Sequence, residues 1–311
     1  MRMNLLHLKY AIEVEKTSSI TKAAENLYMG QPNLSRAIRE LEASLGVTLF
    51  KRTKKGMIPT LEGEEFLACA KKILAQLDTA ENMFKEDRAL KQRFSISVPR
   101  ADYISAAFTD FVKKLDPDCP VEIFYKETNS QRAVNNILSS EFNLAILRYQ
   151  ISYDRQYKAM LEDKGLTSEL VFEFEPVVIM SKNNPLADSD SVSESELSDF
   201  IEIIHGDPYV PSLPVSEVRR EEESGTDRHI YVFERGSQME LLSETDDSFM
   251  RVSPVPQKIL DRFSLVQKKL EGCTKRYRDV LVYKENYRLT PLDRAFIDEL
   301  TAVRRSIDTE K

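Results

Sequence analysis

Apolar residues recur at helical spacing through the first 46 residues, in three blocks separated by short breaks. The first block, 4–16, ends at a Thr-Ser-Ser break, and the second, 20–28, follows a serine that can cap a helix. The third block, 31–46, begins with Gln-Pro, and proline is tolerated in a first helical turn because its missing N–H has no partner there. A short turn containing glycine joins the last two blocks. The pattern therefore predicts a helix-turn-helix.

The third block has two distinct faces. One face is an apolar stripe at steps of four and three that would pack onto the first two helices: Leu34, Ile38, Leu41 and Leu45. The first two turns otherwise offer a small set of mostly polar residues: Gln31, Pro32, Asn33, Ser35, Arg36 and Arg39. In a major groove, Gln and Asn side chains pair with adenine and Arg with guanine. An ordinary surface helix shares this pattern, so the helix alone does not decide between core packing and base readout.

A basic turn follows the third block. Apolar residues flank Lys-Arg-Thr-Lys-Lys-Gly in 47–60, which predicts a small β-hairpin. In isolation, this basic run is more typical of a solvated loop. Because it follows a predicted helix-turn-helix, we interpret it as a wing that brings Arg52, Lys54 and Lys55 to DNA phosphates.

A long amphipathic helix is predicted after Thr60, which can cap it. Its apolar residues form a seam of nearly three heptads: Phe66, Ala70, Ile73, Leu77, Ala80 and Phe84. A core helix would also show such a seam. However, the segment is long, charged elsewhere and placed between regions of different composition, which favours a linker helix that pairs two copies of the chain.

From residue 94 the pattern changes to short apolar runs alternating with amphipathic segments, which indicates βαβ units and a parallel sheet. The segment 187–228 is acidic, and its pattern places no helix within it. The predicted strands cover 94–98, 121–127, 142–147, 169–180, 229–235 and 277–284; the predicted helices cover 103–115, 130–140, 236–244 and the end of the chain from Pro291.

The charge distribution separates the two halves of this pattern. The whole chain has a net charge of −7, but residues 1–60 hold ten Lys or Arg against five Asp or Glu. A basic module joined to an acidic body suggests that the first 60 residues bind a polyanion. No apolar run approaches the roughly 20 residues of a membrane span, and the N-terminus lacks the architecture of a signal peptide, so we expect a cytoplasmic protein that binds no membrane.

Catalytic and metal chemistry find little support. The three cysteines have no C-x-x-C spacing, which argues against a zinc site or a disulfide framework. The three histidines stand in no H-E-x-x-H motif, and the chain has no G-x-S-x-G, P-loop or G-x-G-x-x-G pattern. We expect neither an enzyme nor a cofactor.

Residues 18–67 resemble the N-terminal signature of the LysR-type transcriptional regulators. The matching positions are Ala23, Ala24, Leu27, Gln31, Pro32, Leu34, Ser35, Ile38, Leu41, Glu42, Leu45, Gly46, Leu49, Phe50, Arg52, Gly56, Thr60 and Gly63. One departure is Gly30, where the family commonly has Ser or Thr, so a side-chain cap is absent there.

The resemblance implies an α/β protein with a mainly α-helical, winged helix-turn-helix domain, a long linker helix, and an effector domain of two α/β subdomains like those of periplasmic binding proteins. It also implies a homodimer, often a homotetramer, that binds pseudo-palindromic double-stranded DNA and works with RNA polymerase. The implied ranges are 1–60 for DNA binding, 61–90 for the linker and 91–311 for the effector domain, with subdomain I at 93–172 and 267–311 and subdomain II at 173–266.

Family members bind a small effector between the two subdomains, on loops that follow strands. Carried onto this chain, the effector-binding residues are Arg100, Asp102, Thr128, Asn129, Ser130, Arg148 and His205. Arg100 and Arg148 suit an anionic effector, although both could equally neutralise acids of the domain. The segment 237–256 carries acids where the family has an apolar, glycine-containing run, so a degenerate cleft stays an alternative. A second alternative is a protein that binds a small molecule and reads no DNA.

Overall fold

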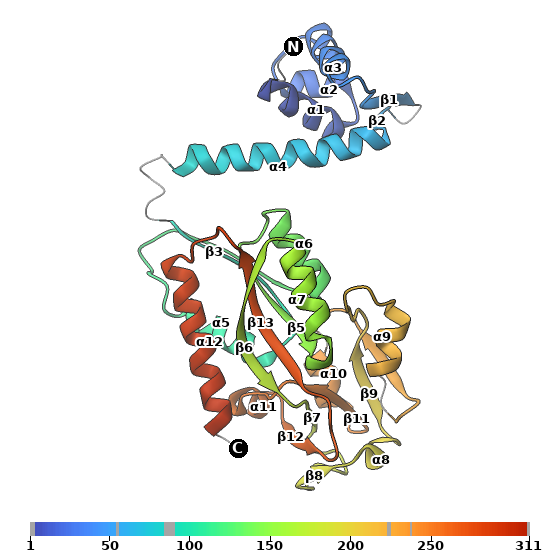
Figure 1. The fold of residues 1–311 in the computed structure, drawn as a ribbon, viewed down its shortest axis with the longest axis vertical. Helices are drawn as coiled ribbons and strands as arrows, with labels where there is room; N and C mark the ends of the chain where they lie inside the picture. Colours follow the sequence, from blue (N-terminus) through green and yellow to red (C-terminus); the bar gives the residue numbers. More distant parts are fainter. Residues whose placement is uncertain (1–3, 54–55, 84–90, 223–224, 237, 310–311) are drawn as a thin grey trace. The chain divides into compact units, whose positions relative to one another are not determined.

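The computed structural model describes residues 4–53, 56–83, 91–222, 225–236 and 238–309. The chain divides into two compact units, Met1–Leu90 and Lys91–Lys311, each with its own apolar core (Figure 1).

The N-terminal unit contains the three predicted helices, the predicted hairpin and the long helix. Ser19 caps the second helix by accepting a hydrogen bond from the Lys22 amide at 3.3 Å. Thr60 caps the fourth in the same way, with its Oγ1 3.0 Å from the Gly63 amide nitrogen. These predictions are confirmed. The elements are α1 (Leu5–Thr17), α2 (Ile20–Asn26), α3 (Gln31–Leu45), β1 (Phe50–Thr53), β2 (Gly56–Pro59) and α4 (Leu61–Met83).

Two contacts fix the hairpin next to the helices. The Glu42 carboxylate on α3 accepts hydrogen bonds from the Leu49 and Phe50 amides, at 2.7 and 3.2 Å. Gly56 has a φ of +109°, and a Cβ there would lie 2.4 Å from the Ser18 carbonyl oxygen, so only glycine fits this close approach. The start of β1 and the start of β2 therefore both lie against the helix-turn-helix.

The apolar seams of α3 and α4 differ in part from the prediction. Leu45 is 37% exposed, so the stripe on α3 ends at Leu41. Ala70 is fully buried within the unit and Phe66 packs against its core, so these two predicted dimer contacts are occupied inside one chain. Ile73 and Leu77 are half-buried. The Ala80 side chain and Phe84 lie outside the described residues.

The first subdomain of the C-terminal unit is built on a five-stranded sheet in the order β4-β3-β5-β13-β6. β3 pairs parallel with β4 and β5, but β13 pairs antiparallel with β5 and β6. The predicted parallel sheet is thus a mixed sheet, because the chain returns to it from the second subdomain. Its strands are β3 (Gln92–Val98), β4 (Val121–Glu127), β5 (Leu144–Gln150), β6 (Leu166–Phe174) and β13 (Tyr277–Lys284).

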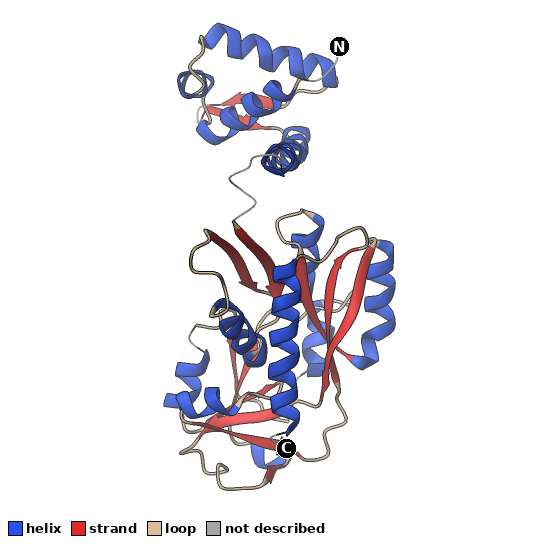
Figure 2. Ribbon diagram, turned by 90° about the vertical axis from the view of Figure 1, so that its left-hand side faces the viewer, coloured by secondary structure: helices blue, strands red, loops and turns tan. Residues whose placement is uncertain are grey.

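Helices cover both faces of this sheet, as Figures 1 and 2 show. Leu144 and Ile146 of β5 pack into one apolar cluster, whereas Ala145 and Leu147 pack into another. Alternate residues of a strand point to opposite faces, which explains the continuous apolar run. α5 (Asp102–Val112) and α12 (Pro291–Thr309) belong to the first cluster, and α6 (Ser130–Leu138) and α7 (Asp154–Asp163), after the 3-10 turn Ile151–Tyr153, belong to the second.

The second subdomain has a six-stranded sheet in the order β10-β9-β11-β7-β12-β8. β12 pairs with β7 in this sheet, so the chain returns to the first subdomain after Leu270, later than the predicted return at about residue 267. The elements are β7 (Val177–Ser181), β8 (Ser191–Val192), α8 (Glu194–Leu197), β9 (Ile201–His205), α9 (Val215–Glu222), β10 (His229–Val232), α10 (Gln238–Glu244), β11 (Ser248–Val252), α11 (Gln257–Arg262) and β12 (Leu265–Leu270).

Candidate functional site

The polar face of α3 is open to solvent. Its side chains at Gln31, Pro32, Asn33, Arg36 and Arg39 are exposed, and Ser35 is half-buried. Within the helix, the Arg39 Nε donates to the Ser35 carbonyl at 3.3 Å. The opposite side of α3 is anchored by fully buried Leu34 and Leu41. The helix therefore presents polar groups outward from a fixed position.

Exposed cations accompany this face. Arg52 on β1 is exposed, like Arg36 and Arg39, and none of the three forms an ion pair with an acid in the described part of the chain. Lys54 and Lys55 lie outside the described residues. Exposed guanidinium groups that hold no carboxylate bind phosphates and base edges without first breaking an ion pair.

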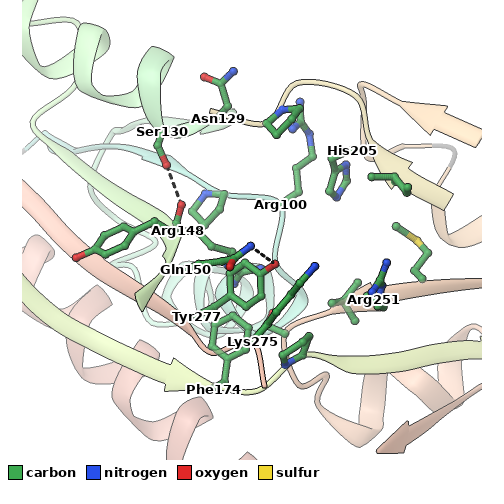
Figure 3. A pocket seen from close by; sticks show the side chains of 18 of the residues that line it. Arg100, Asn129, Ser130, Arg148, Gln150, Phe174, His205, Arg251, Lys275 and Tyr277 are labelled. Carbon is green, nitrogen blue, oxygen red and sulfur yellow. Dashed lines mark hydrogen bonds between the residues drawn. The ribbon is translucent and has the colours of Figure 1, made fainter. Parts of the chain in front are cut away.

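A cavity of about 330 Å³ lies between the two subdomains of the C-terminal unit. Its wall in the first subdomain is formed where strands end: Arg100 follows β3, Thr128–Ser130 join β4 to α6, and Arg148 lies on β5. Figure 3 shows Ser130 turned toward Arg148, to whose carbonyl its Oγ donates at 3.1 Å. The opposite wall includes His205, at the end of β9. These predicted residues therefore meet at one cavity.

Arg100 is paired across the cavity. Its Nη1 donates to the Asp207 carboxylate at 2.8 Å and its Nη2 at 3.4 Å. It also donates to the Phe233 carbonyl. Asp207 and Phe233 belong to the second subdomain, so this predicted anion-binding arginine joins the two subdomains.

Arg148 forms a second pair, with a carboxylate that is completely buried. Its Nε and Nη2 donate to the two oxygens of Asp279 at 2.9 and 2.7 Å, and Asp279 is fully buried. The Tyr103 hydroxyl donates to the same carboxylate at 2.6 Å. Burial alone would lower the pKa of Arg148, but the attraction of Asp279 outweighs it and raises that pKa. The guanidinium also lies 4.8 Å from the centre of the Phe174 ring. Arg100 and Arg148 therefore neutralise acids of the domain, which is the alternative that the sequence left open.

Asp102 is not among the residues that line the cavity. It stands in the first turn of α5, only 4% exposed, and is paired with Arg235 of the second subdomain. Arg235 also contacts Glu127 at 2.6 Å. Burial raises the pKa of Asp102, and Arg235 partly offsets this. The side chain of Asp102 thus lies in the junction between the subdomains, and not in the cavity for which it is predicted.

His205 lines the cavity as a neutral side chain. Its Nδ1 atom is buried and has no hydrogen-bond partner among the described residues. Burial, followed by the nearby positive charge of Arg100, lowers the pKa of the imidazole to about 4. At neutral pH this residue therefore adds no charge to the wall.

Besides Tyr149, which follows Arg148 on β5, the aromatic wall consists of residues that sequence reasoning missed: Tyr153, Phe174, Tyr209 and Tyr277. Tyr149 is held in place by stacking on Tyr157, with ring centres 4.1 Å apart. Arg251 of β11 was also missed; it pairs with both oxygens of Glu202 at 2.7 and 3.0 Å. The density of tyrosines around the predicted strand 142–147 was an available signal.

The acids of the segment 237–256, which raised the alternative of a degenerate cleft, do not line the cavity. Asp246 accepts a hydrogen bond from the Ser181 hydroxyl at 2.9 Å, and Asp247 lies 3.4 Å from Arg228. Both sit in the turn between α10 and β11, whereas Met250–Ser253 of the same segment reach the cavity.

Two further searches of the described residues gave negative results. No group of three or more His, Cys, Asp or Glu side chains there could hold a metal ion. No helix among them combines the length and the apolar character that crossing a bilayer requires.

Comparison with known proteins places both units in one family. Residues 5–64 match the model described as the bacterial regulatory helix-turn-helix protein, lysR family. The chain is 29% identical over 211 residues to the Hca operon transcriptional activator HcaR of Escherichia coli (strain K12), a match that spans 66% of each chain and so just under two thirds of that relative. It is 26% identical over 300 residues to the transcriptional regulator AlsR of Bacillus subtilis (strain 168), covering 95% of this chain and 94% of AlsR.

A solved structure supports the same conclusion for the fold. Full-length CbnR, in a complex with its target DNA, superimposes with a TM-score of 0.63 over 98% of this chain and 100% of CbnR, at 17% sequence identity. The signature helices, the hairpin and the two α/β subdomains thus occur together in this chain as they do in these regulators. The chain belongs to the LysR-type family of transcriptional regulators.

Proposed function

We propose that this chain is a sequence-specific DNA-binding regulator of transcription in which α3 enters the major groove. The observation that carries the proposal is that Arg36 and Arg39 are exposed and form no ion pair with the described residues, on a helix whose opposite side is buried in a core. Gln31 and Asn33 at the start of the helix would read adenines, and the two arginines would read guanines. Arg52 on the hairpin would bind a phosphate.

We further propose that the interdomain cavity holds a small-molecule effector. A concave site of about 330 Å³ between two subdomains has the size and position of a ligand pocket. A ligand that binds one arrangement of the subdomains more tightly would shift the population of that arrangement. A dimer formed through the part of α4 from Ile73 onward, where Ile73 and Leu77 are half-buried, would carry two DNA-reading heads to a pseudo-palindromic site. RNA polymerase would be a further partner there.

Replacing both arginines tests DNA binding directly. A duplex is first selected from a random pool by the unmodified chain, and its affinity is measured by fluorescence anisotropy at fixed salt. The double variant Arg36→Ala/Arg39→Ala should bind about 100-fold more weakly, because each bidentate contact to a base contributes about 1–3 kcal/mol.

A matched control removes a cation that the proposal does not use. Lys182 is exposed in the C-terminal unit, just after β7. Lys182→Ala should leave the affinity unchanged. The proposal fails if the double variant binds as tightly as Lys182→Ala does.

A further inference from the structure

Every arginine at the wall of the cavity already holds a carboxylate. Arg100 is paired with Asp207, Arg148 with Asp279, and Arg251 with Glu202. Lys275 and Glu194 add one charge of each sign to the wall. The wall therefore carries four cations and three carboxylates, and buried Asp279, which is not part of the wall, supplies the fourth negative charge.

The Asp207 carboxylate occupies a site in the first subdomain that is shaped for a carboxylate. Besides the two-pronged contact with Arg100, it lies 3.4 Å from the Asn129 Nδ2 and 3.5 Å from the Arg132 Nη1. The Arg100 and Asp207 side chains are only 8% and 13% exposed. A fork-shaped guanidinium, an amide and a second cation around one carboxylate form the arrangement that a bound organic acid would use. Here a residue of the second subdomain fills it.

Aromatic rings form a second part of the wall, among aliphatic and small polar residues. Tyr149, Tyr153, Phe174, Tyr209 and Tyr277 line the cavity, and the rings of Phe174 and Tyr277 are nearly parallel, 5.9 Å apart between centres. Figure 3 shows Phe174, Tyr277 and Gln150 grouped on one side, with Arg100 and His205 across from them. Flat apolar faces with a few hydrogen-bonding groups between them suit a planar ring.

We propose that the cavity takes an uncharged ligand built on a planar ring, and that Asp207 is the residue that excludes ring carboxylates. The inference deepens the proposed function, because it assumes that this cavity is the effector site. An incoming carboxylate would meet arginines that are already neutralised and would place a second negative charge beside Asp207 in a poorly solvated space. An amide or a hydroxyl brings no such charge.

Matched pairs of ligands test the ligand class on the full chain. The probes are benzamide and benzoate, phenylacetamide and phenylacetate, and nicotinamide and nicotinate, titrated by calorimetry. In at least one pair the amide should bind about tenfold more tightly than its acid, the size expected for one charged contact. Tighter binding of the acids, or binding of neither member of any pair, overturns the proposal.

Two variants test the role of Asp207. Asp207→Asn keeps the size of the side chain and frees the charge of Arg100, so the preference should reverse by about tenfold toward the acid. The double variant Arg100→Gln/Asp207→Asn removes both charges and should again bind the amide more tightly than the acid. An Asp207→Asn chain that folds and keeps the amide preference contradicts the role given to Asp207.

If the Asp207→Asn chain shows no cooperative unfolding transition, and so is not folded, the Arg100→Gln variant alone tests the role of Asp207. It leaves Asp207 with only the longer ion pair to Arg132, at 3.5 Å, so binding of the acids should weaken further while binding of the amides changes little. Stronger binding of the acids to Arg100→Gln would refute the inference.

DNA binding is measured on the same preparations, so that the two proposals can fail separately. A chain that binds duplex DNA but prefers the acids keeps its proposed function and loses this ligand class. A chain that binds the amides but no DNA keeps the ligand class and loses the DNA-reading role.

Discussion

The two units of this chain use arginine in opposite ways. In the N-terminal unit, Arg36, Arg39 and Arg52 are exposed and form no ion pair with the described residues. In the C-terminal unit, Arg148 and Arg251 are largely buried, and each holds a carboxylate in two-pronged contact. Exposed cations leave their attraction available to an external polyanion, whereas buried pairs satisfy it within the fold.

Each buried pair is neutral, so it adds nothing to the net charge of its unit. An acidic unit that keeps its arginines inside needs acids placed beside them, and several of these pairs join the two subdomains. Arg100 binds Asp207, and Arg235 binds Asp102 and Glu127, in each case across the junction. The same residue type therefore recognises a partner in one unit and joins subdomains in the other.

The strongest way to break the comparison is to remove the partner of a buried arginine. Asp279→Ala leaves the Arg148 guanidinium buried without its carboxylate and removes the acceptor of the Tyr103 hydroxyl. We expect the free energy of unfolding to fall by about 3–5 kcal/mol, measured by urea denaturation followed by circular dichroism. Asp188→Ala, at an exposed acid, is the control. A loss similar to that of the control would mean that burial of the pair has little energetic weight.

The next effect is a pH dependence that originates at His205. Its pKa is about 4 in the folded chain against an ordinary 6.5, so the unfolded chain binds more protons between these values. The stability that this imidazole contributes is present above pH 6.5 and is lost as the pH falls toward 4.

Between pH 7 and pH 5, the native chain should therefore lose about 2 kcal/mol more stability than the His205→Gln variant does. Urea denaturation of both chains at the two pH values measures the difference. Because every other titrating group is common to both chains, parallel losses would show that His205 is solvated and titrates normally.

A smaller effect is expected inside the N-terminal unit, where the Glu42 carboxylate accepts hydrogen bonds from the backbone. Glu42→Ala removes the acceptor of the Leu49 and Phe50 amides. We expect a loss of about 1–2 kcal/mol in unfolding free energy, together with weaker DNA binding, because the hairpin loses its fixed position. Glu40→Ala, exposed on the same helix, should change neither quantity.

The sequence predicts the N-terminal unit well because its signals are local. Pro32 near the start of α3, the stripe at Leu34 and Ile38, and the Thr60 cap each act within one or two helical turns. The cavity is predictable only in outline. Arg100 and Arg148 are found because strand ends meet at one edge of a sheet, but their partners lie 107 and 131 residues away in the chain.

Those distant partners also explain the errors. Asp102 was assigned to the ligand because its sequence neighbourhood cannot show Arg235, 133 residues later. Ala70 and Phe66 fit a heptad seam, and a seam looks the same whether another chain or the chain's own core covers it. Strand β9 and helix α9 fall in the acidic segment, where the periodic pattern is too weak to place them.

The smallest expected change sharpens the comparison most. Arg36→Ala/Arg39→Ala should alter the unfolding free energy by no more than about 0.5 kcal/mol, because both side chains are exposed and no described acid loses a partner. The same double variant should lose most of its DNA affinity, so stability and binding separate in this unit. In the C-terminal unit, a change at Arg148 cannot affect binding without affecting stability, because removing either member of its pair leaves a buried charge. A loss above about 1 kcal/mol in the double variant would show that these arginines also have a structural role, and the contrast between the two units would then fail.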